Sequence, residues 1–494
     1  MTQNMLINAV HPEEFRVALV EGQSLEGFFI ETASRGKFVG NIYKAIIAHV
    51  QPSLQAAFVN YGTDKNGFLP FPEIHPEYYR QEAAESARIQ DVISPGQEVL
   101  VQVVKEEIGN KGALLTTYIS LAGRDVVLMP GQSQRGVSRK IEDEAQRERL
   151  KQLANDLSIP EELGIIIRTV AENRTKREIV KDLNHMIRVW EEIKKRVQET
   201  AAPGLIYKEQ DLAIRVVRDF FNTDIKTILI DDKDVHRRVK EFLRIISPKQ
   251  QHSVKLYKGD GPIFVKYNLE DQIEQIFQRK VSLKSGAYLI IDQTEALVSI
   301  DVNSGKSGSK VALEETVYKV NMEAAAEIPR QLRLRDLGGL IVIDFIDMRD
   351  RRHIREVERK LKEETKKDKA KITIGRISRF GLLELSRQYL GLNIQRGSYK
   401  ECSICQGTGL VRSPEATALC YLRKIWLTLV QKNPATVKAT VSLEVANYLL
   451  NQKRIDLSRL EERYDVAISI EGSSRLLPHE GAVEFSARES TPQI

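Results

Sequence analysis

Hydrophobic positions recur with different periods along the chain and divide it into segments. "FRVALVEG" and "LEGFFIE" alternate apolar with polar residues, so we predict short strands over residues 1–35. Residues 36–120 continue with short segments separated by glycines, such as "AAFVNYG" and "GQEVLVQVV". Short strands joined by tight turns are typical of a small β-barrel, which we predict for this segment.

Residues 121–213 combine a strand, "GIIIRTV", with a long helix. The apolar residues of that helix recur every three or four positions and form one stripe: Ile179, Leu183, Met186, Trp190, Ile193 and Val197. A single stripe of this kind packs against a hydrophobic core. We therefore interpret it as core and not as a ligand site.

Residues 214–280 alternate strand and helix again, through "TILIDD" and "FVKYNLEDQIEQIF". Residues 281–399 then read as the strand "ALVSIDVN", a helix near Val311–Leu332, the strand "GGLIVIDFIDM" and a charged helix. A strand, a helix and a second strand in this order favour a parallel pair of strands. A small α/β segment completes the chain, and the fold class predicted is α/β with several domains.

Composition narrows the class of protein. The chain has 494 residues, of which 42% are hydrophobic and 29% charged, as in soluble globular proteins. We find no apolar run long enough for a transmembrane helix and no signal peptide. Three cysteines argue against a disulfide framework and for a reducing compartment, so we expect a cytoplasmic protein. The net charge of +6 is a weak sign of anionic partners.

Polar residues interrupt two of the predicted strands near their carboxyl ends. Because side chains alternate along a strand, Asp301 and Asn303 share a face, and Asp344 interrupts the next apolar strand at the corresponding end. Ligand sites of open α/β sheets lie at these ends, and oxygen ligands suit Mg²⁺. Helix capping or a loop position is the alternative, and the residues alone leave both interpretations open.

Two further groups of residues could contact a nucleic acid. Phe58 and Phe68 lie beside glycines in the predicted barrel, with Lys111 on a later strand, which suits stacked bases and neutralised phosphates. Burial of both phenylalanines in the core is equally compatible with the pattern. Arg168 and Thr169 end a strand just before a helix and could bind phosphate, although a lone arginine is more often a surface charge.

The stretch "ECSICQGTG" places Cys402 and Cys405 at the spacing of a zinc knuckle. Zinc takes four ligands, and the chain supplies no other pair nearby. The next histidine is His479, far outside the usual spacing, and Cys420 stands alone in an apolar helical segment. Either zinc is absent, or a second chain supplies the other two thiolates.

Four motifs resemble the ribonuclease E/G family in the order that this family has them: "VSIDVNSG", "RDLGGLIVIDFIDM", "ISRFGLLELSRQ" and "CSICQGTG". The resemblance covers nearly the whole chain and weakens in the last eighty or so residues. It implies an RNase H-like part (1–35 and 214–280), interrupted by an OB-fold RNA-binding domain (36–120) and a 5′-sensor (121–213). It also implies a DNase I-like catalytic part (281–399), a zinc link (400–415) and a small C-terminal domain (416–494).

The same resemblance implies a role for each candidate residue. Asp301 and Asp344 correspond to magnesium ligands, and Asn303 corresponds to a catalytic asparagine. Arg168, Thr169 and the backbone of Val127 correspond to contacts with a 5′-monophosphate. The positions that bind RNA fall on Phe58, Phe68 and Lys111. Cys402 and Cys405 form half of a zinc site that two chains share.

The expected function is therefore a magnesium-dependent endoribonuclease that acts on single-stranded RNA, including ribosomal and messenger RNA. It would leave a 5′-phosphate and a 3′-hydroxyl, and a 5′-monophosphate on the substrate would stimulate it. We expect a zinc-linked homodimer, or a tetramer of two such dimers. Since the sequence ends at Ile494 without a long C-terminal scaffold, we expect a member closer to the ribonuclease G type. A non-catalytic RNA-binding assembly factor and a DNA nuclease or polymerase-like metal enzyme are the alternatives.

Overall fold

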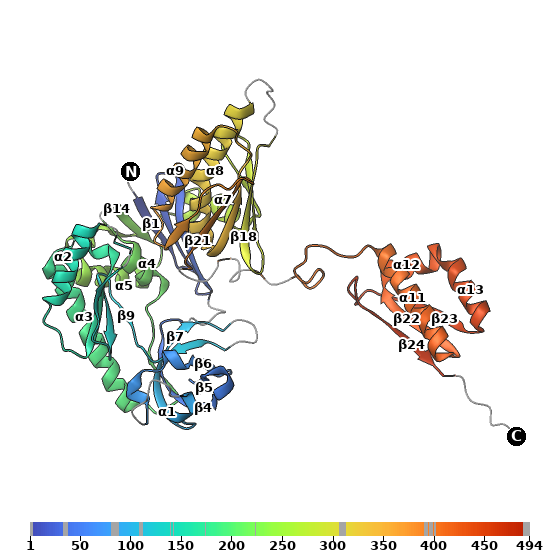
Figure 1. Cartoon of the computed structure of the whole chain (residues 1–494), viewed down its shortest axis with the longest axis horizontal. Helices are drawn as coiled ribbons and strands as arrows, with labels where there is room; N and C mark the ends of the chain where they lie inside the picture. Colours follow the sequence, from blue (N-terminus) through green and yellow to red (C-terminus); the bar gives the residue numbers. More distant parts are fainter. Residues whose placement is uncertain are drawn as a thin grey trace. The chain divides into compact units, whose positions relative to one another are not determined.

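The chain folds into two compact units, Met1–Gly397 and Ser398–Ile494, which are described one at a time (Figure 1). The structure is a computed structural model, and it describes residues 3–32, 38–80, 88–107, 112–138, 140–141, 143–172, 174–222, 224–305, 313–389, 394, 399 and 402–487. Within these residues, none of the helices combines the length and the apolar character needed to span a bilayer.

The first sheet of the larger unit joins the start of the chain to a segment far along it. Its order is β15-β14-β1-β2-β3, with β1 parallel to β14 and antiparallel to β2. Met5 and Leu6 of β1 belong to different hydrophobic clusters, so the sheet is covered on both faces. Its strands span Gln3–Asn8 (β1), Glu14–Glu21 (β2), Ser24–Thr32 (β3), Ile225–Ile230 (β14) and Val254–Leu256 (β15). The nearby helices span Leu212–Phe220 (α4), Lys233–Ile246 (α5), Ile263–Lys266 (α6) and Glu270–Phe277 (α7).

The second sheet is the expected small barrel. Its order is β13-β4-β5-β6-β8-β7, and a further pairing between β4 and β7 closes it. Inward-facing aliphatic residues such as Ile47, Val59 and Leu69 fill its interior. Its strands span Ile42–Gln51 (β4), Ala56–Asn60 (β5), Gly67–Pro70 (β6), Glu98–Lys105 (β7), Leu114–Thr116 (β8) and Gly204–Tyr207 (β13), and the short helix α1 spans Ile89–Val92.

The third sheet has the order β11-β12-β10-β9 and carries the long helix that the apolar stripe predicted. Ile179, Leu183, Met186 and Ile193 are buried in one cluster with the strands, and Trp190 packs against it, so the interpretation of the stripe as core is confirmed. The strands span Leu121–Ala122 (β9), Val126–Pro130 (β10), Arg135–Val137 (β11) and Leu163–Ile167 (β12). The helices span Glu144–Asn155 (α2) and Lys176–Glu199 (α3).

The fourth sheet contains the predicted parallel pair. Its order is β16-β17-β18-β19-β21-β20, and β18 is parallel to β19. Helices α8 and α9 lie side by side along the sheet, and both contribute to the hydrophobic cluster that buries one of its faces (Figure 1). The strands span Lys280–Ser282 (β16), Tyr288–Gln293 (β17), Leu297–Asn303 (β18), Gly339–Asp344 (β19), Ile372–Ile374 (β20) and Leu382–Arg387 (β21). The helices span Leu313–Arg335 (α8) and Arg351–Thr365 (α9).

In its described residues, the smaller unit packs helices against a three-stranded sheet of order β23-β22-β24. Tyr421, Ile425 and Leu429 line the buried face of its first helix, and the two cysteines of the knuckle precede that helix. The helices span Pro414–Lys432 (α11), Leu443–Gln452 (α12) and Arg454–Tyr464 (α13). The strands span Thr436–Ser442 (β22), Ala467–Ser473 (β23) and Gly481–Ser486 (β24).

Candidate active site

Two carboxylates lie opposite each other on the open face of the fourth sheet. In the parallel pair of β18 and β19, Asp301 is in register with Asp344. Their neighbours Ile300 and Ile343 point into the buried cluster, whereas both aspartate side chains are exposed. The predicted strand alternation places both side chains on the open face, and the pairing of β18 with β19 brings the two carboxylates together. This arrangement favours the metal-site interpretation over a capping role.

Asn303 belongs to the same group. Its Nδ2 donates a hydrogen bond to Asp301 Oδ2 at 2.8 Å, so the amide fixes the orientation of that carboxylate. Partial burial raises the pKa of Asp344 above its ordinary value, and the negative charges of Asp301 and Asp347 raise it further. Neighbouring carboxylates repel each other when both are ionised, and a divalent cation bound between them offsets this repulsion.

The donor atoms at this end of the sheet are carboxylate and amide oxygens, which Mg²⁺ prefers over softer ligands. The described residues contain no group of three or more histidine, cysteine, aspartate or glutamate side chains placed to bind one ion. A cation held here would therefore take two carboxylates from the chain and complete its shell with water or substrate oxygens, as magnesium commonly does.

Two residues that were not predicted from the sequence also shape this site. Asp347 follows Asp344 by three positions and contributes to the electrostatic environment of that carboxylate; the repeated aspartates of "IDFID" could have indicated it. Asn321 of α8 is fully buried and makes two hydrogen bonds to the backbone of Ile346. Its Nδ2 donates to Ile346 O at 2.8 Å, and Ile346 N donates to its Oδ1 at 3.2 Å. Asn321 thereby fixes the loop that leaves β19.

The barrel presents an aromatic row on its outer surface. Phe58 and Phe68 pair directly across β5 and β6 with their rings 5.8 Å apart, and both side chains are half-buried and outside the core cluster. His49 of β4 stacks on Phe58 at 4.6 Å and is exposed. The row therefore spans three strands, and His49 is a member that sequence reasoning missed. Lys111 lies outside the described residues.

Arg168, Thr169 and Val127 lie near one end of the two central strands of the third sheet, since Val127 pairs with Ile166 where β10 begins and β12 ends. The Arg168 guanidinium already has two acceptors. Its Nη1 donates to Gly123 O at 2.6 Å, and its Nη2 forms an ion pair with Asp219 Oδ1 at 2.8 Å. A phosphate would therefore bind beside these partners, which is compatible with the five N–H donors of a guanidinium.

The helix that we expected directly after Arg168 begins farther along the chain than predicted. Only one 3₁₀ turn, Thr169–Ala171, follows this residue, and α3 begins at Lys176. Thr175 is the N-cap of α3 because it accepts from Glu178 N while the Glu178 side chain accepts from Thr175 N. Phosphate binding at Arg168 would therefore rest on side chains and on local N–H groups.

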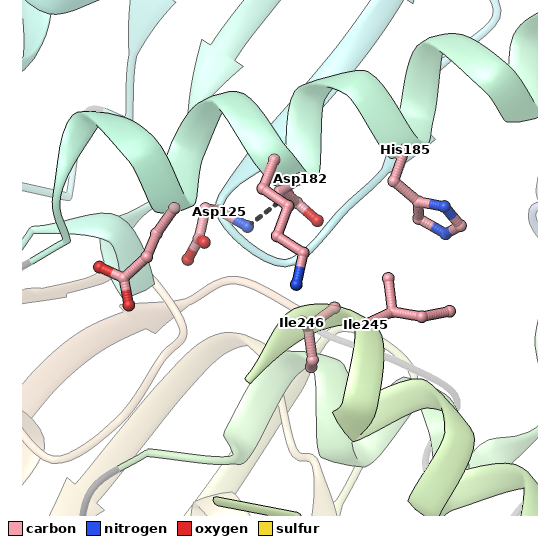
Figure 2. Close-up of a pocket in the computed structure, with 7 residues that line it drawn as sticks. Asp125, Asp182, His185, Ile245 and Ile246 are labelled. Atoms are coloured by element: carbon pink, nitrogen blue, oxygen red, sulfur yellow. Dashed lines mark hydrogen bonds between the residues drawn. The ribbon is translucent and has the colours of Figure 1, made fainter. Parts of the chain in front are cut away.

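Asp182 of α3 organises the loop beside Arg168. Its Oδ2 accepts from Asp125 N at 2.8 Å and from Val126 N at 3.1 Å. Figure 2 shows Asp125, Asp182 and His185 on one side of a pocket and Ile245 and Ile246 of α5 on the other. Burial, followed by the charge of Asp182, raises the pKa of Asp125 to about 6.

Gly123 belongs to this loop and leaves no room for a side chain. A Cβ there would lie 2.5 Å from Asp182 Oδ2 and 2.9 Å from Val126 O. The glycine therefore permits the close approach of the loop to α3. Its carbonyl, which accepts from Arg168, is held in place by that approach.

Cys402 and Cys405 lie in a turn at the start of the smaller unit, the first exposed and the second half-buried. Backbone N–H groups of Cys405 and Ile404, and then the Cys405 thiol, lower the pKa of Cys402, which favours the thiolate that binds zinc. His479, set aside because of its distance in sequence, lies near this turn: its Nε2 is 3.3 Å from Gln406 Nε2.

Comparisons with known proteins cover both units. The family profile described as "Ribonuclease E/G family" matches residues 120–390, "S1 RNA binding domain" matches 37–117, and "RNase E/G, Thioredoxin-like domain" matches 401–485. The chain is 46% identical over 471 residues to ribonuclease E of Haemophilus influenzae, covering 95% of the chain and 50% of that protein. It is 44% identical over 498 residues to ribonuclease E of Escherichia coli K12, covering 100% of the chain and 47% of that protein.

The similarity to Escherichia coli K12 ribonuclease G is 37% identity over 490 residues, covering 95% of the chain and 100% of that protein. Identity is thus higher with these two relatives named ribonuclease E, whereas the length corresponds to that of ribonuclease G. The chain spans about half the length of the curated ribonuclease E relatives it matches.

Proposed function

This chain belongs to the ribonuclease E/G family, and on that premise we propose that it is a magnesium-dependent endoribonuclease acting on single-stranded RNA. The observation that carries the proposal is the register of Asp301 with Asp344, with Asn303 bonded to the first carboxylate. A non-catalytic RNA-binding factor has no need of two opposed carboxylates. The match to an S1 RNA binding domain favours RNA over DNA as the substrate.

Asp301 and Asp344 would hold the magnesium ion. When bound, magnesium polarises a scissile phosphate and lowers the pKa of a coordinated water. Asn303 keeps the Asp301 carboxylate in one orientation through its Nδ2, and Asn321 keeps the loop beyond Asp344 in place. Attack of water on phosphorus with departure of the 3′-oxygen would leave a 3′-hydroxyl and a 5′-phosphate on the products.

The barrel would hold the single-stranded substrate. Bases stack on accessible aromatic rings, and the row of exposed His49 with half-buried Phe58 and Phe68 provides such a surface outside the barrel core. Lys111, outside the described residues, would neutralise a phosphate. Ribosomal and messenger RNA are the proposed substrate classes, because they supply single-stranded segments between folded ones.

A 5′-monophosphate would bind at Arg168, Thr169 and the backbone of Val127. The support is that these residues lie near the same end of the paired strands β10 and β12, and that Gly123 O and Asp219 fix the orientation of the Arg168 side chain. An arginine held in this way loses little conformational freedom when a phosphate binds. This contact would account for stimulation by a 5′-monophosphate.

Zinc would join two copies of the chain. Each copy offers the thiols of Cys402 and Cys405, and a tetrahedral zinc takes four ligands. The lowered pKa of Cys402 suits thiolate binding. A homodimer follows from a shared ion, and a tetramer would require a second interface.

One assay tests the central proposal. A short A/U-rich RNA carrying either a 5′-monophosphate or a 5′-hydroxyl is incubated with the full chain, with and without magnesium. We expect cleavage only with magnesium and faster cleavage of the 5′-monophosphorylated RNA, with 5′-phosphate and 3′-hydroxyl product ends. Cleavage that persists in a chelator, or products with 2′,3′-cyclic ends, would contradict the proposed chemistry.

A further inference from the structure

An aromatic side chain is exposed near the carboxylate pair, at the tip of the loop between β20 and β21. The Phe380 side chain is 69% exposed. Hydrogen bonds define the loop: Ser378 N donates to Leu382 O at 2.8 Å, and Gly381 N donates to Ser378 O at 3.1 Å. The exposed ring therefore stands on an ordered turn.

This turn lies at the carboxyl end of β19, where the carboxylates are. Leu382 pairs directly with Asp344 across β21 and β19. Gly381 contacts the loop beyond Asp344, because a Cβ there would lie 3.1 Å from Asp347 Oδ1. Phe380 is thus the residue before a glycine that contacts Asp347, so the turn that carries the exposed ring lies beside the acidic group.

A cation accompanies the ring. The guanidinium carbon of Arg379 lies 4.8 Å from the centroid of Phe380, and Arg379 and nearby Arg376 are both exposed. An aromatic face with adjacent positive charge is the combination that binds single-stranded nucleic acid, because the base stacks and the backbone phosphate is neutralised. The two arginines make an RNA strand a better match than a purely apolar protein partner.

We propose that Phe380 stacks on the nucleobase next to the scissile phosphate, with Arg379 beside the RNA backbone. This would be a base contact at the carboxylate pair itself, separate from the aromatic row of the barrel. It rests on the proposed endoribonuclease function and adds a residue that determines which nucleotide adjoins the cut. Any base can stack on a ring, but purines present the larger stacking surface, so we expect a modest preference for purines at the contacted position.

The test is a substitution cycle on an RNA with one cleavage site. We compare kcat/KM of the parent chain, Phe380→Ala and Phe380→Trp on intact RNA and on a set of abasic RNAs. Each abasic RNA lacks the base at one position flanking the cut. Phe380→Ala should lower kcat/KM by roughly 5- to 150-fold on intact RNA, the range for loss of one stacked base. Phe380→Trp should stay within a few-fold of the parent.

The abasic substrates identify the partner of the ring. When the base at the contacted position is missing, kcat/KM of the parent should fall to the value of Phe380→Ala on intact RNA. The kcat/KM of Phe380→Ala should not fall further on the same abasic RNA. Tyr389→Ala is the matched control, since Tyr389 is 52% exposed beyond the opposite end of β21; it should behave as the parent does. Equal activity of Phe380→Ala and the parent, or an equal loss on every abasic RNA, would overturn the proposal. A changed oligomeric state on size exclusion without an abasic effect would assign Phe380 to a protein contact and overturn it too.

A binding measurement separates this inference from the proposed function. In an Asp344→Asn background, the Kd for the same RNAs is measured, and the abasic effect should again disappear when Phe380 is alanine. Absence of magnesium-dependent cleavage by the parent chain would speak against the proposed function. Absence of the abasic effect in both binding and cleavage would speak against the role of Phe380.

Discussion

Asp301 and Asp344 occupy directly opposed positions on two parallel strands, with both side chains on the face that no helix of the buried cluster covers. Forty-three positions separate them in sequence, and only the pairing of β18 with β19 brings them together. The two adjacent negative charges favour a bound cation, so neutralising either carboxylate should weaken metal binding.

Asp301→Asn and Asp344→Asn should each abolish RNA cleavage while leaving RNA affinity within a few-fold of the parent. Neutralising either carboxylate removes a magnesium ligand, whereas binding depends on the barrel. Single-turnover cleavage and Kd are the measurements. Glu384→Gln is the control, because Glu384 is an exposed carboxylate on β21 of the same sheet and should retain parent activity. A cleavage rate within a few-fold of the parent for either aspartate variant would show that the metal assignment is incorrect.

Phe58→Ala and Phe68→Ala should each weaken binding of single-stranded RNA by roughly 1–3 kcal/mol. Because the two rings touch, the double variant should lose less than the sum of the single losses. Titration of a fluorescent RNA gives the Kd values. Leu54→Ala, which removes another exposed apolar side chain of the barrel, should leave the Kd unchanged.

A large loss of thermal stability with unchanged RNA affinity would instead show that both phenylalanines serve the core.

Lys111→Ala should act differently, because a phosphate contact is electrostatic. We expect the slope of log Kobs against log salt to fall in magnitude by about one.

Arg168→Ala should reduce the preference for 5′-monophosphorylated RNA and leave cleavage of 5′-hydroxyl RNA nearly unchanged. The charge-assisted contact exists only when the phosphate does. The ratio of kcat/KM for the two substrates is the measurement. Arg177→Ala, an exposed arginine in the first turn of α3, is the control.

Arg168 also donates to Gly123 O and pairs with Asp219, so its removal should lower thermal stability as well. Arg168→Lys separates the two effects, since lysine keeps the charge without the planar fork. An equal loss of activity on both RNAs would indicate that Arg168 serves folding or general RNA binding.

Asp125→Asn should make the free energy of unfolding less dependent on pH between about 4 and 7. Burial, then Asp182, raises the pKa of folded Asp125 from 3.8 to about 6. The folded state therefore binds more protons than the unfolded state in this window, and parent stability falls as pH rises. The difference between variant and parent should grow toward neutral pH, by at most about 3 kcal/mol.

Other charges face Asp125 and determine the size of this effect: Asp182, Arg174, Arg124 and Glu178. Denaturant unfolding at a series of pH values measures it, with Asp156→Asn as a control at an exposed aspartate of the same domain. A difference that is constant with pH, or that shrinks toward neutrality, would show that Asp125 stays ionised throughout.

The double variant Cys402→Ser, Cys405→Ser should lose zinc and elute as a smaller species on size exclusion. Four thiolates from two chains bind one ion, so metal binding and dimerisation form one coupled equilibrium, worth on the order of 10 kcal/mol. Metal analysis of the parent should give one zinc per two chains.

His479→Ala tests whether this histidine binds the zinc, because His479 lies beside Gln406 at the knuckle. We expect this variant to keep its zinc. Loss of zinc from His479→Ala, or one zinc per chain in the parent, would mean that a single chain completes the site with its own histidine.

Local patterns in the sequence were sufficient for much of the fold. Alternation along "ALVSIDVN" predicted which side chains leave the core, and the three- and four-residue spacing along α3 predicted its buried face. Both follow from the geometry of a single element, which repeats every two or 3.6 residues whatever it packs against. The motifs resembling the ribonuclease E/G family predicted a set of candidate functional residues, and the comparisons support that family.

The tertiary structure decided the relationships between elements. Four relationships join segments far apart in sequence: the register of Asp301 with Asp344, the two acceptors of Arg168, the approach of His479 to Gln406 and the contact of Gly381 with Asp347. Periodicity shows which face of an element is apolar, but it carries no information on which other element covers that face. Strand register and contacts between loops depend on the packing of the whole domain, so only the folded chain determines them.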